Sequence, residues 1–194
     1  MVTHLDIPLK SSFLSCEKNT ELILQKLFIE NKQHSKTLKK LLVVNTKDCF
    51  DDKYSHLIQD MSLSELKDKG YIRLNPKLEL KEHNEVMSYI VLSYDNFTPT
   101  DNPEFRDCII NFDILCHTDY WDLNDYKIRP LQIAGYIDGI LNNEKLVGIG
   151  TLEFVGCNEL ILSEHLSGYT LSYLATHGRE DYIPENGAAP VYYG

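Results

Sequence analysis

Residues whose types could perform chemistry are concentrated between residues 112 and 141. This stretch holds the adjacent pair Cys116 and His117, a series of aspartates and the only tryptophan of the chain. A Cys–His nucleophile requires the imidazole to reach the thiol in space. The strict alternation of residues 106–117 predicts a β-strand, on which adjacent side chains point to opposite faces. We therefore expect Cys116 to be a small buried apolar residue and not half of a catalytic pair.

Other patterns that could bind a metal or a phosphate lack the required spacing. Asp119, Asp122 and Asp125 have neither the alternating oxygen ligands nor the turn glycine and closing glutamate of a calcium loop. Glu79 and Lys81 match the Glu-x-Lys pair of metal-dependent nucleases, but their segment is too polar for a core strand. The glycines of GIGTLEFVG leave a helix and enter a strand, which is the reverse of a phosphate cradle. The sequence predicts no catalytic residues, no metal site and no cofactor, and hence no enzyme.

The elements that position these residues follow from hydrophobic periodicity and turn signals. Helices are predicted over residues 20–44 (with Thr20 as N-cap), 51–60, 62–70 and 130–142. Strands are predicted over residues 85–94, 106–117, 151–163 and 168–176, with a long turn over 95–105 and a turn or weak edge strand over 75–85. The expected fold class is α+β: an antiparallel β-sheet built from two hairpins and flanked by helices, one N-terminal and one between the hairpins.

The same periodicities predict which side chains enter the core. On strand 106–117 the inward set is Cys108, Ile110, Phe112, Ile114 and Cys116. On helix 130–142 the apolar stripe is Leu131, Ala134, Ile137 and Leu141. Ser62 and Glu65 fit a capping box, and Gly70 fits the end of that helix.

The charge of the chain is unevenly distributed. The formal net charge is −10 over 194 residues; residues 1–60 have nine Lys against eight Asp and Glu, and residues 61–194 have ten Lys and Arg against 21 Asp and Glu. Binding to DNA phosphates requires clustered cations, which the acidic body lacks. A wall that repels phosphate still allows DNA to slide past it. Residues 17–40 hold six Lys against three Glu, which suits either an anion-binding face or a solvated helix face.

Five cysteines without a CxxC pair, and a start without an export signal, predict reduced thiols. No apolar run approaches the length of a membrane span. The expected organisation is an N-terminal extension over residues 1–19, a single α+β domain over 20–177 and a C-terminal arm over 178–194. The arm has no regular period, so its apolar residues suit either docking onto a neighbouring subunit or a frayed terminus. Those interface candidates are Tyr182, Ile183, Val191, Tyr192 and Tyr193.

The run from residue 110 to 181 resembles neck and tail structural proteins of tailed bacteriophages. The motifs RPLQIAGYID, LNN and GIGTLEF, followed by a last hairpin that ends in HG, carry this resemblance. The resemblance is to the tail-terminator or tail-completion group and to related head–tail joining proteins. TLKKLLVVNTKDCF also resembles the helix that opens such proteins, so the similarity covers about residues 37–181.

The resemblance implies a non-enzymatic virion protein that assembles in the bacterial cytoplasm into a ring, usually a hexamer. Such a ring caps the tail tube and joins it to the head-side connector, while DNA passes through without specific binding. It further implies lumen or neighbour contacts from the 95–105 loop, with candidates Asp95, Asn96, Thr98, Thr100, Asp101 and Asn102. Two alternatives stay open: a metal-dependent nuclease or other DNA-processing enzyme of a phage, and a tail assembly chaperone or adaptor.

Overall fold

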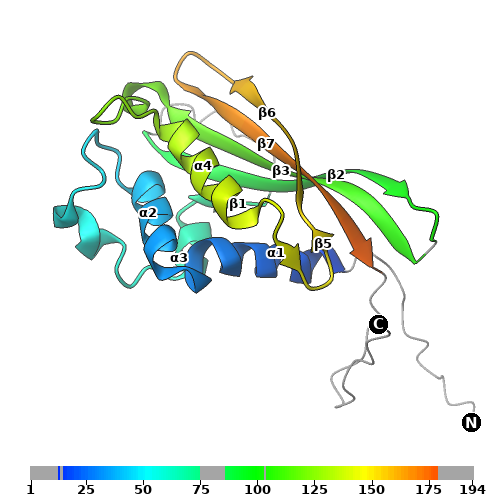
Figure 1. The fold of residues 1–194 in the computed structure, drawn as a ribbon. Coiled ribbons are helices and arrows are strands. Elements are labelled where there is room, and N and C mark those ends of the chain that lie inside the picture. Colours follow the sequence, from blue (N-terminus) through cyan, green and yellow to red (C-terminus); the bar gives the residue numbers. More distant parts are fainter. Residues whose placement is uncertain (1–12, 14, 75–85, 103, 179–194) are drawn as a thin grey trace, which may run out of the picture.

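A sheet with helices packed on one face forms the frame of the protein (Figure 1). The computed structural model describes residues 13, 15–74, 86–102 and 104–178. Its helices are α1 (Ser15–Gln25), the π-helical η1 (Lys26–Glu30), α2 (Lys32–Val43), the 3-10 helix η2 (Asp52–Leu57), α3 (Leu63–Asp68), the 3-10 helix η4 (Thr118–Tyr120) and α4 (Arg129–Leu141). Its strands are β1 (Ile72–Arg73), β2 (Ser88–Pro99), β3 (Phe105–His117), β4 (Lys145–Leu146), β5 (Gly150–Thr151), β6 (Glu153–Ile161) and β7 (Leu166–Gly178).

The main sheet has the strand order β1-β2-β3-β7-β6. The hairpins β2–β3 and β6–β7 are antiparallel, and β3 pairs with β7 along its whole length to join them. The predicted α+β class with two hairpins is confirmed. The sheet is nevertheless mixed, because the two-residue strand β1 adds to β2 in parallel.

The core lies between the sheet and the helices. All five residues predicted to face inward on β3 are 0 % exposed, and α4 packs across β3 and β7. On α4 the buried residues are Arg129, Pro130, Ile133, Ala134, Ile137 and Leu141. The prediction was wrong for Leu131, which is 42 % exposed. The helix begins one residue earlier than expected, and its buried face contains Pro130 in place of Leu131.

The predicted helix over residues 20–44 is broken. Thr20 is not an N-cap: it lies within α1, where its hydroxyl donates to the carbonyl oxygen of Cys16 at 2.7 Å. The break falls at Asn31, whose φ of −96° and ψ of 88° leave the helical region. Asn31 then caps α2, because its side chain accepts a hydrogen bond from the backbone N–H of His34. A helix start therefore sits inside what the apolar period presented as one helix.

The predicted long turn over residues 95–105 is also wrong in extent. Asp95, Asn96 and Thr98 belong to β2, and Thr98 and Pro99 still pair with β3. A β-bulge between Asp95 and Thr98, with Asn96 at φ 52°, lets the ladder continue. Only the segment after Pro99 forms the turn, which contains the other predicted loop residues, Thr100, Asp101 and Asn102.

Local signals around α3 are confirmed. Ser62 and Glu65 make both hydrogen bonds of the capping box. Gly70 has φ 76°, the left-handed conformation that commonly follows a helix end and that glycine adopts without strain. These local signals fix where α3 begins and ends.

Candidate functional site

The pair that first suggested catalysis is separated as predicted. Cys116 is 0 % exposed in the core, and burial raises the pKa of its thiol to about 12. His117 faces the other way, stacked on His165 with 5.7 Å between ring centroids and 1° between ring planes. Its Nδ1 accepts a hydrogen bond from the backbone N–H of Asp119 at 3.3 Å. His117 therefore anchors the start of η4 and does not contact the thiol.

The aspartates after β3 do not converge. Asp119 is 72 % exposed beside His117, and Asp125 is 84 % exposed with Lys127 at 3.9 Å. Within the described ranges, no three His, Cys, Asp or Glu side chains lie close enough together to hold a metal ion. Glu79 and Lys81, the pair considered for a nuclease, lie outside the described residues.

The fold does assemble a Cys–His–Asn cluster that the sequence reasoning missed. Asn19 Nδ2 donates to His177 Nδ1 at 2.7 Å, which leaves the ring hydrogen on Nε2, 2.8 Å from Cys108 Sγ. These are the residue types of a thiol-protease triad. All three residues are 0 % exposed, and burial raises the pKa of Cys108 to about 12 and lowers the pKa of His177. A nucleophilic site needs an accessible thiolate, which this buried thiol does not supply. The role that its hydrogen bonds support is structural, because they join α1 to β3 and β7.

A signal for this cluster is present in the sequence. The inward alternation of β7 runs through Leu171, Tyr173 and Ala175 and continues to His177. On β3 the inward set begins at Cys108. Both residues therefore belong to the core face, whereas the contribution of Asn19 depends on how α1 packs and has no comparable signal.

Arg129 is the other buried polar centre. Its guanidinium donates to the backbone carbonyl oxygens of Tyr120 (2.8 Å), Leu41 (2.6 Å), Val44 (3.0 Å) and Thr46 (2.6 Å). Burial lowers the pKa of Arg129, since desolvation disfavours the charged form. The cation lies at the C-terminal end of α2, where the helix dipole and unpaired carbonyls favour positive charge. This one side chain holds α2, the 118–120 turn and α4 in a fixed arrangement.

The sheet face opposite the helices is buried at one end and partly exposed along the rest. One end of it carries a small apolar cluster, and no residue of a described helix belongs to that cluster: Met87, Tyr89, Val91, Leu115 and Leu166, with Tyr71, Leu160 and Leu162 packed against it. Towards the tip of the β2–β3 hairpin the same face becomes polar. The described helices pack on the opposite side of the sheet (Figure 1).

A row of hydrogen bonds fixes the polar part of this face. Thr170 donates to Asp113 Oδ1 at 2.6 Å, and Thr176 donates to Asp107 Oδ1 at 2.7 Å. Between them, Ser172 donates to the side-chain oxygen of Asn111 at 2.6 Å. Each pair lies directly across β3 and β7. The acceptor groups are therefore held in register along the strands.

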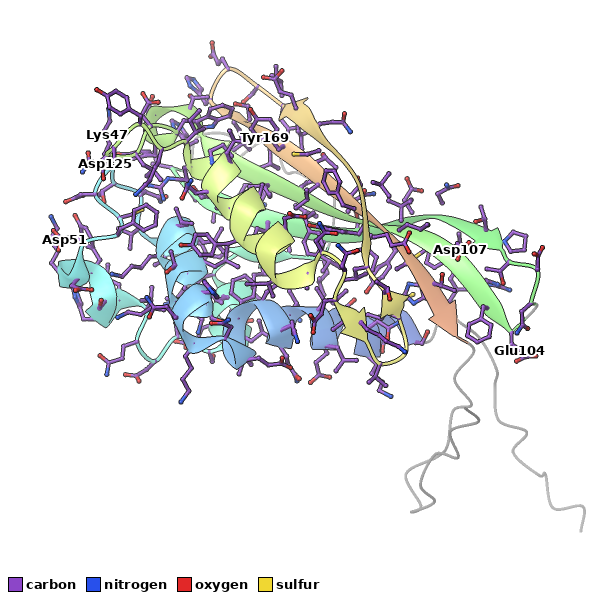
Figure 2. All side chains as sticks on the ribbon, in the orientation of Figure 1. Lys47, Asp51, Glu104, Asp107, Asp125 and Tyr169 are labelled. Atoms are coloured by element: carbon purple, nitrogen blue, oxygen red, sulfur yellow. The ribbon has the colours of Figure 1, made fainter. Side chains whose placement is uncertain are left out.

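The face is predominantly acidic. The one cation that strand register places on it is Arg73 of β1, which pairs with Val91 and lies 4.0 Å from the ring centroid of Tyr89. By strand register, Asp95, Asp107, Asp113 and Glu153 all point away from the helices. Strands β2, β3, β6 and β7 contain a single Lys or Arg, Arg106, which pairs with the inward residue His177. Figure 2 places Asp107 and Glu104 along the projecting hairpin, far from Lys47, Asp51 and Asp125 at the other end. This surface repels polyanions.

The structure describes the predicted loop residues but not the predicted arm residues. Thr100, Asp101 and Asn102 form the hairpin turn, where Thr100 Oγ1 donates to the carbonyl oxygen of Asn102 at 2.7 Å. Asp95, Asn96 and Thr98 lie on the last part of β2 and project from it beside that turn. The arm candidates, Tyr182, Ile183, Val191, Tyr192 and Tyr193, lie outside the described residues.

The comparisons identify a family without assigning a chemistry. No curated protein matches the chain. No helix in the described part of the chain combines the length and apolarity needed to cross a bilayer. The family model YomW matches residues 35–175. This range contains most of α2, all of α4, and the main sheet except the last three residues of β7. Because this match covers more than half of the sequence, the chain belongs to the phage-associated YomW family.

Proposed function

We propose that this phage protein is a non-enzymatic subunit of a ring at the neck or upper tail of the virion. The ring caps the tail tube and joins it to the head-side connector, with DNA passing through its channel. The observation that carries the proposal is the acidic sheet face, which has four outward carboxylates, Asp95, Asp107, Asp113 and Glu153, against one outward cation, Arg73 of β1. Phage-associated family membership supports the virion setting.

Electrostatics favours this face as a channel wall. Fixed carboxylates within about 10 Å of a phosphate backbone repel it at moderate salt, so DNA does not adhere. The hydroxyl groups of Thr170 and Thr176 orient the carboxylates of Asp113 and Asp107 without neutralising their charge. A wall of this kind needs no sequence reading, which agrees with the absence of a clustered basic surface on these strands.

The size of the sheet also suits a ring. The longest strands have 13 residues, which gives a wall about 43 Å tall at the usual rise per residue. Five strands spaced about 4.8 Å apart give a wall about 20–25 Å wide. Six such walls on a sixfold axis would leave roughly 40 Å between opposite sheets before side chains are counted. Duplex DNA fits through such an opening.

Purified particles provide the test. Quantitative mass spectrometry of purified phage should find the chain at a copy number that matches one ring, and imaging should place it between head and tail. A chain that is abundant in the lysate and absent from particles would overturn the proposal in favour of an assembly factor. Mg²⁺-dependent DNA cleavage that disappears in Glu79→Ala would overturn it in favour of a nuclease.

Charge reversal on the proposed wall tests the orientation of the subunit. Asp95→Lys combined with Glu153→Lys places two cations on the open face. We expect particles that assemble but release DNA more slowly, because lysines attract the passing phosphates. The matched control, Glu30→Lys with Asp52→Lys, changes two side chains on η1 and η2 that are 55 % and 96 % exposed on the helical side of the sheet, and it should leave release unchanged. Equal release rates in both variants would place the open face away from DNA.

A further inference from the structure

A groove on the helical side lies outside all the features used so far. It runs between α2 and the segment from η2 to the start of α3, with a volume of about 510 Å³. Its apolar lining consists of Phe28, Ile29, Ile58, Met61 and Leu63. Ile29 is 53 % exposed, so the groove presents apolar surface to solvent next to the break between η1 and α2.

Lysines surround this apolar floor. Lys32, Lys36 and Lys39 all line the groove. Lys32 and Lys36 are exposed and make no ion pair with any described residue. Lys39 donates to the carbonyl oxygen of Met61 at 2.8 Å, and burial lowers its pKa, with Glu65 acting in the opposite direction. The rim is therefore a local excess of positive charge on a chain of net charge −10.

The other lysines of this region differ. Lys26 is paired with Glu144 at 2.6 Å and with Glu30 at 3.4 Å. Lys40 is buried, and its ammonium donates to the carbonyl oxygens of Phe50 and Asp51. These two lysines serve internal contacts. Of the lysines in this region, Lys32 and Lys36 are the two that are exposed without an ion pair to a described residue, so the groove fits a ligand that combines carboxylates with apolar side chains.

The chain itself contains such a ligand in its C-terminal arm. Glu180, Asp181 and Glu185 flank Tyr182 and Ile183 within six residues. We propose that this segment of one copy binds in the lysine-rimmed groove of a neighbouring copy, with Tyr182 and Ile183 on the apolar floor. The inference rests on the proposed ring, since it names the contact that links one subunit to the next. Contacts of this kind are heterologous and close a ring by rotation.

The length of the chain after β7 allows a contact between copies. β7 ends at Gly178. The 16 residues after Gly178 could span up to about 50 Å when extended, enough to reach an adjacent subunit. An acidic aromatic segment and a lysine-rimmed apolar groove are complementary in charge and in apolar surface.

Photo-crosslinking in the full-length protein tests the contact. A photoreactive phenylalanine analogue at position 182, in an equal mixture of isotopically light and heavy protein, distinguishes contacts between copies from contacts within one. We expect light–heavy crosslinks from position 182 to peptides that contain residues 28–39 or 55–63, with a yield that rises with protein concentration. The same mapping in purified particles should give the same peptides.

Charge-swap variants test the role of the rim. Lys32→Glu with Lys36→Glu should lower the crosslink yield at least tenfold, and adding Glu180→Lys with Asp181→Lys should restore it. The matched control is Lys69→Glu with Lys145→Glu, two exposed lysines outside the groove, which should leave the yield unchanged. All four lysines are exposed, so we expect each variant to fold. Circular dichroism checks this.

Three results would overturn the inference: crosslinks only within one copy, crosslinks that map outside the groove, or no effect of reversing Lys32 and Lys36. If the chain is nevertheless present as a ring in particles, the proposed function stands and the subunit contact lies elsewhere. If the chain is absent from particles but the crosslinks form, the contact stands and the neck position fails.

Discussion

Replacing Arg129 by methionine is the most direct test of how this fold is held together. The side chain is 0 % exposed, and no carboxylate among the described residues pairs with it. Its partners are four backbone carbonyl oxygens at 2.6–3.0 Å, three of them at or just after the end of α2. Methionine fills similar space as the arginine stem but donates no hydrogen bond, so the four carbonyls lose their donor.

The expected loss is large. A hydrogen bond to a charged group contributes roughly 1.5–3 kcal/mol, and a buried carbonyl left without a partner costs about 1–3 kcal/mol. Part of this is recovered, because methionine removes the cost of burying a charge. We expect a net loss of about 3–5 kcal/mol from a total that is typically about 5–15 kcal/mol. Arg129→Lys should fall between wild type and Arg129→Met, since one ammonium cannot span four carbonyls in the way that a planar guanidinium does.

Urea unfolding followed by far-UV circular dichroism measures this loss. With a slope near 2 kcal/mol per molar urea, the midpoint of Arg129→Met should fall by about 1.5–2.5 M. Dilute protein keeps self-association from adding to the apparent stability. The control is Arg106→Met: Arg106 lies over the ring of Phe13 at 5.0 Å, so its loss should cost less than about 1 kcal/mol. A change below about 1 kcal/mol in Arg129→Met would refute the assignment of Arg129 as the organising residue.

Three further predictions concern single positions. In Gly168→Ala the new Cβ would lie 1.8 Å from the carbonyl oxygen of Ile114, so β7 must shift away from β3. The free energy of unfolding should drop by at least about 2 kcal/mol in the same urea assay. A drop below about 0.5 kcal/mol would contradict the register of β3 and β7. Tyr126 has φ 59° and is fully exposed. Tyr126→Gly should raise the thermal midpoint, because glycine adopts the left-handed conformation without strain and the free energy of unfolding increases by about 0.5–1 kcal/mol. A lowered midpoint would show that the tyrosine makes stabilising contacts. The pKa of His177 in the folded protein lies below its ordinary value, so the unfolded chain takes up the proton at a higher pH than the folded one. The free energy of unfolding should therefore be highest above about pH 6.5. It should fall as the pH drops towards the folded-state pKa, by up to about 1.4 kcal/mol per pH unit. His177→Gln should reduce that slope, and an unchanged slope would assign the pH dependence to other groups.

The strands and their faces could be predicted from the sequence because alternation has a period of two, which a buried face imposes residue by residue. Cys108, Ile110, Phe112 and Ile114 all lie where the pattern placed them. The α4 stripe was nearly right for the same reason. The prediction for Leu131 was wrong because the helical period alone does not decide which residues of the first turn face the core. In the structure Arg129 and Pro130 take those positions.

The features that could not be predicted depend on partners far along the chain. The turn-like composition of residues 95–99 is overridden because β3 supplies a pairing partner and Asn96 adopts the positive φ that the bulge needs. Arg129 is a surface residue by type, yet carbonyl oxygens 83–88 residues earlier in the chain draw its guanidinium inside. His177 joins Asn19 across 158 residues. No local pattern encodes such contacts.

The division between internal and external polar groups bears on function more than any motif does. Arg129, His177 and Lys40 are residue types that can perform chemistry, but each is buried and bonded to backbone or core partners. Two other groups lie at the surface: carboxylates on the outward sheet face, where Asp107 and Asp113 accept hydrogen bonds from threonines, and Lys32 and Lys36 beside an apolar groove. An internal hydrogen-bond network fixes the shape, so these two surfaces are presented at constant separation in every copy. In the proposed ring every subunit repeats the same contact at the same angle, which a constant separation between these two surfaces would allow.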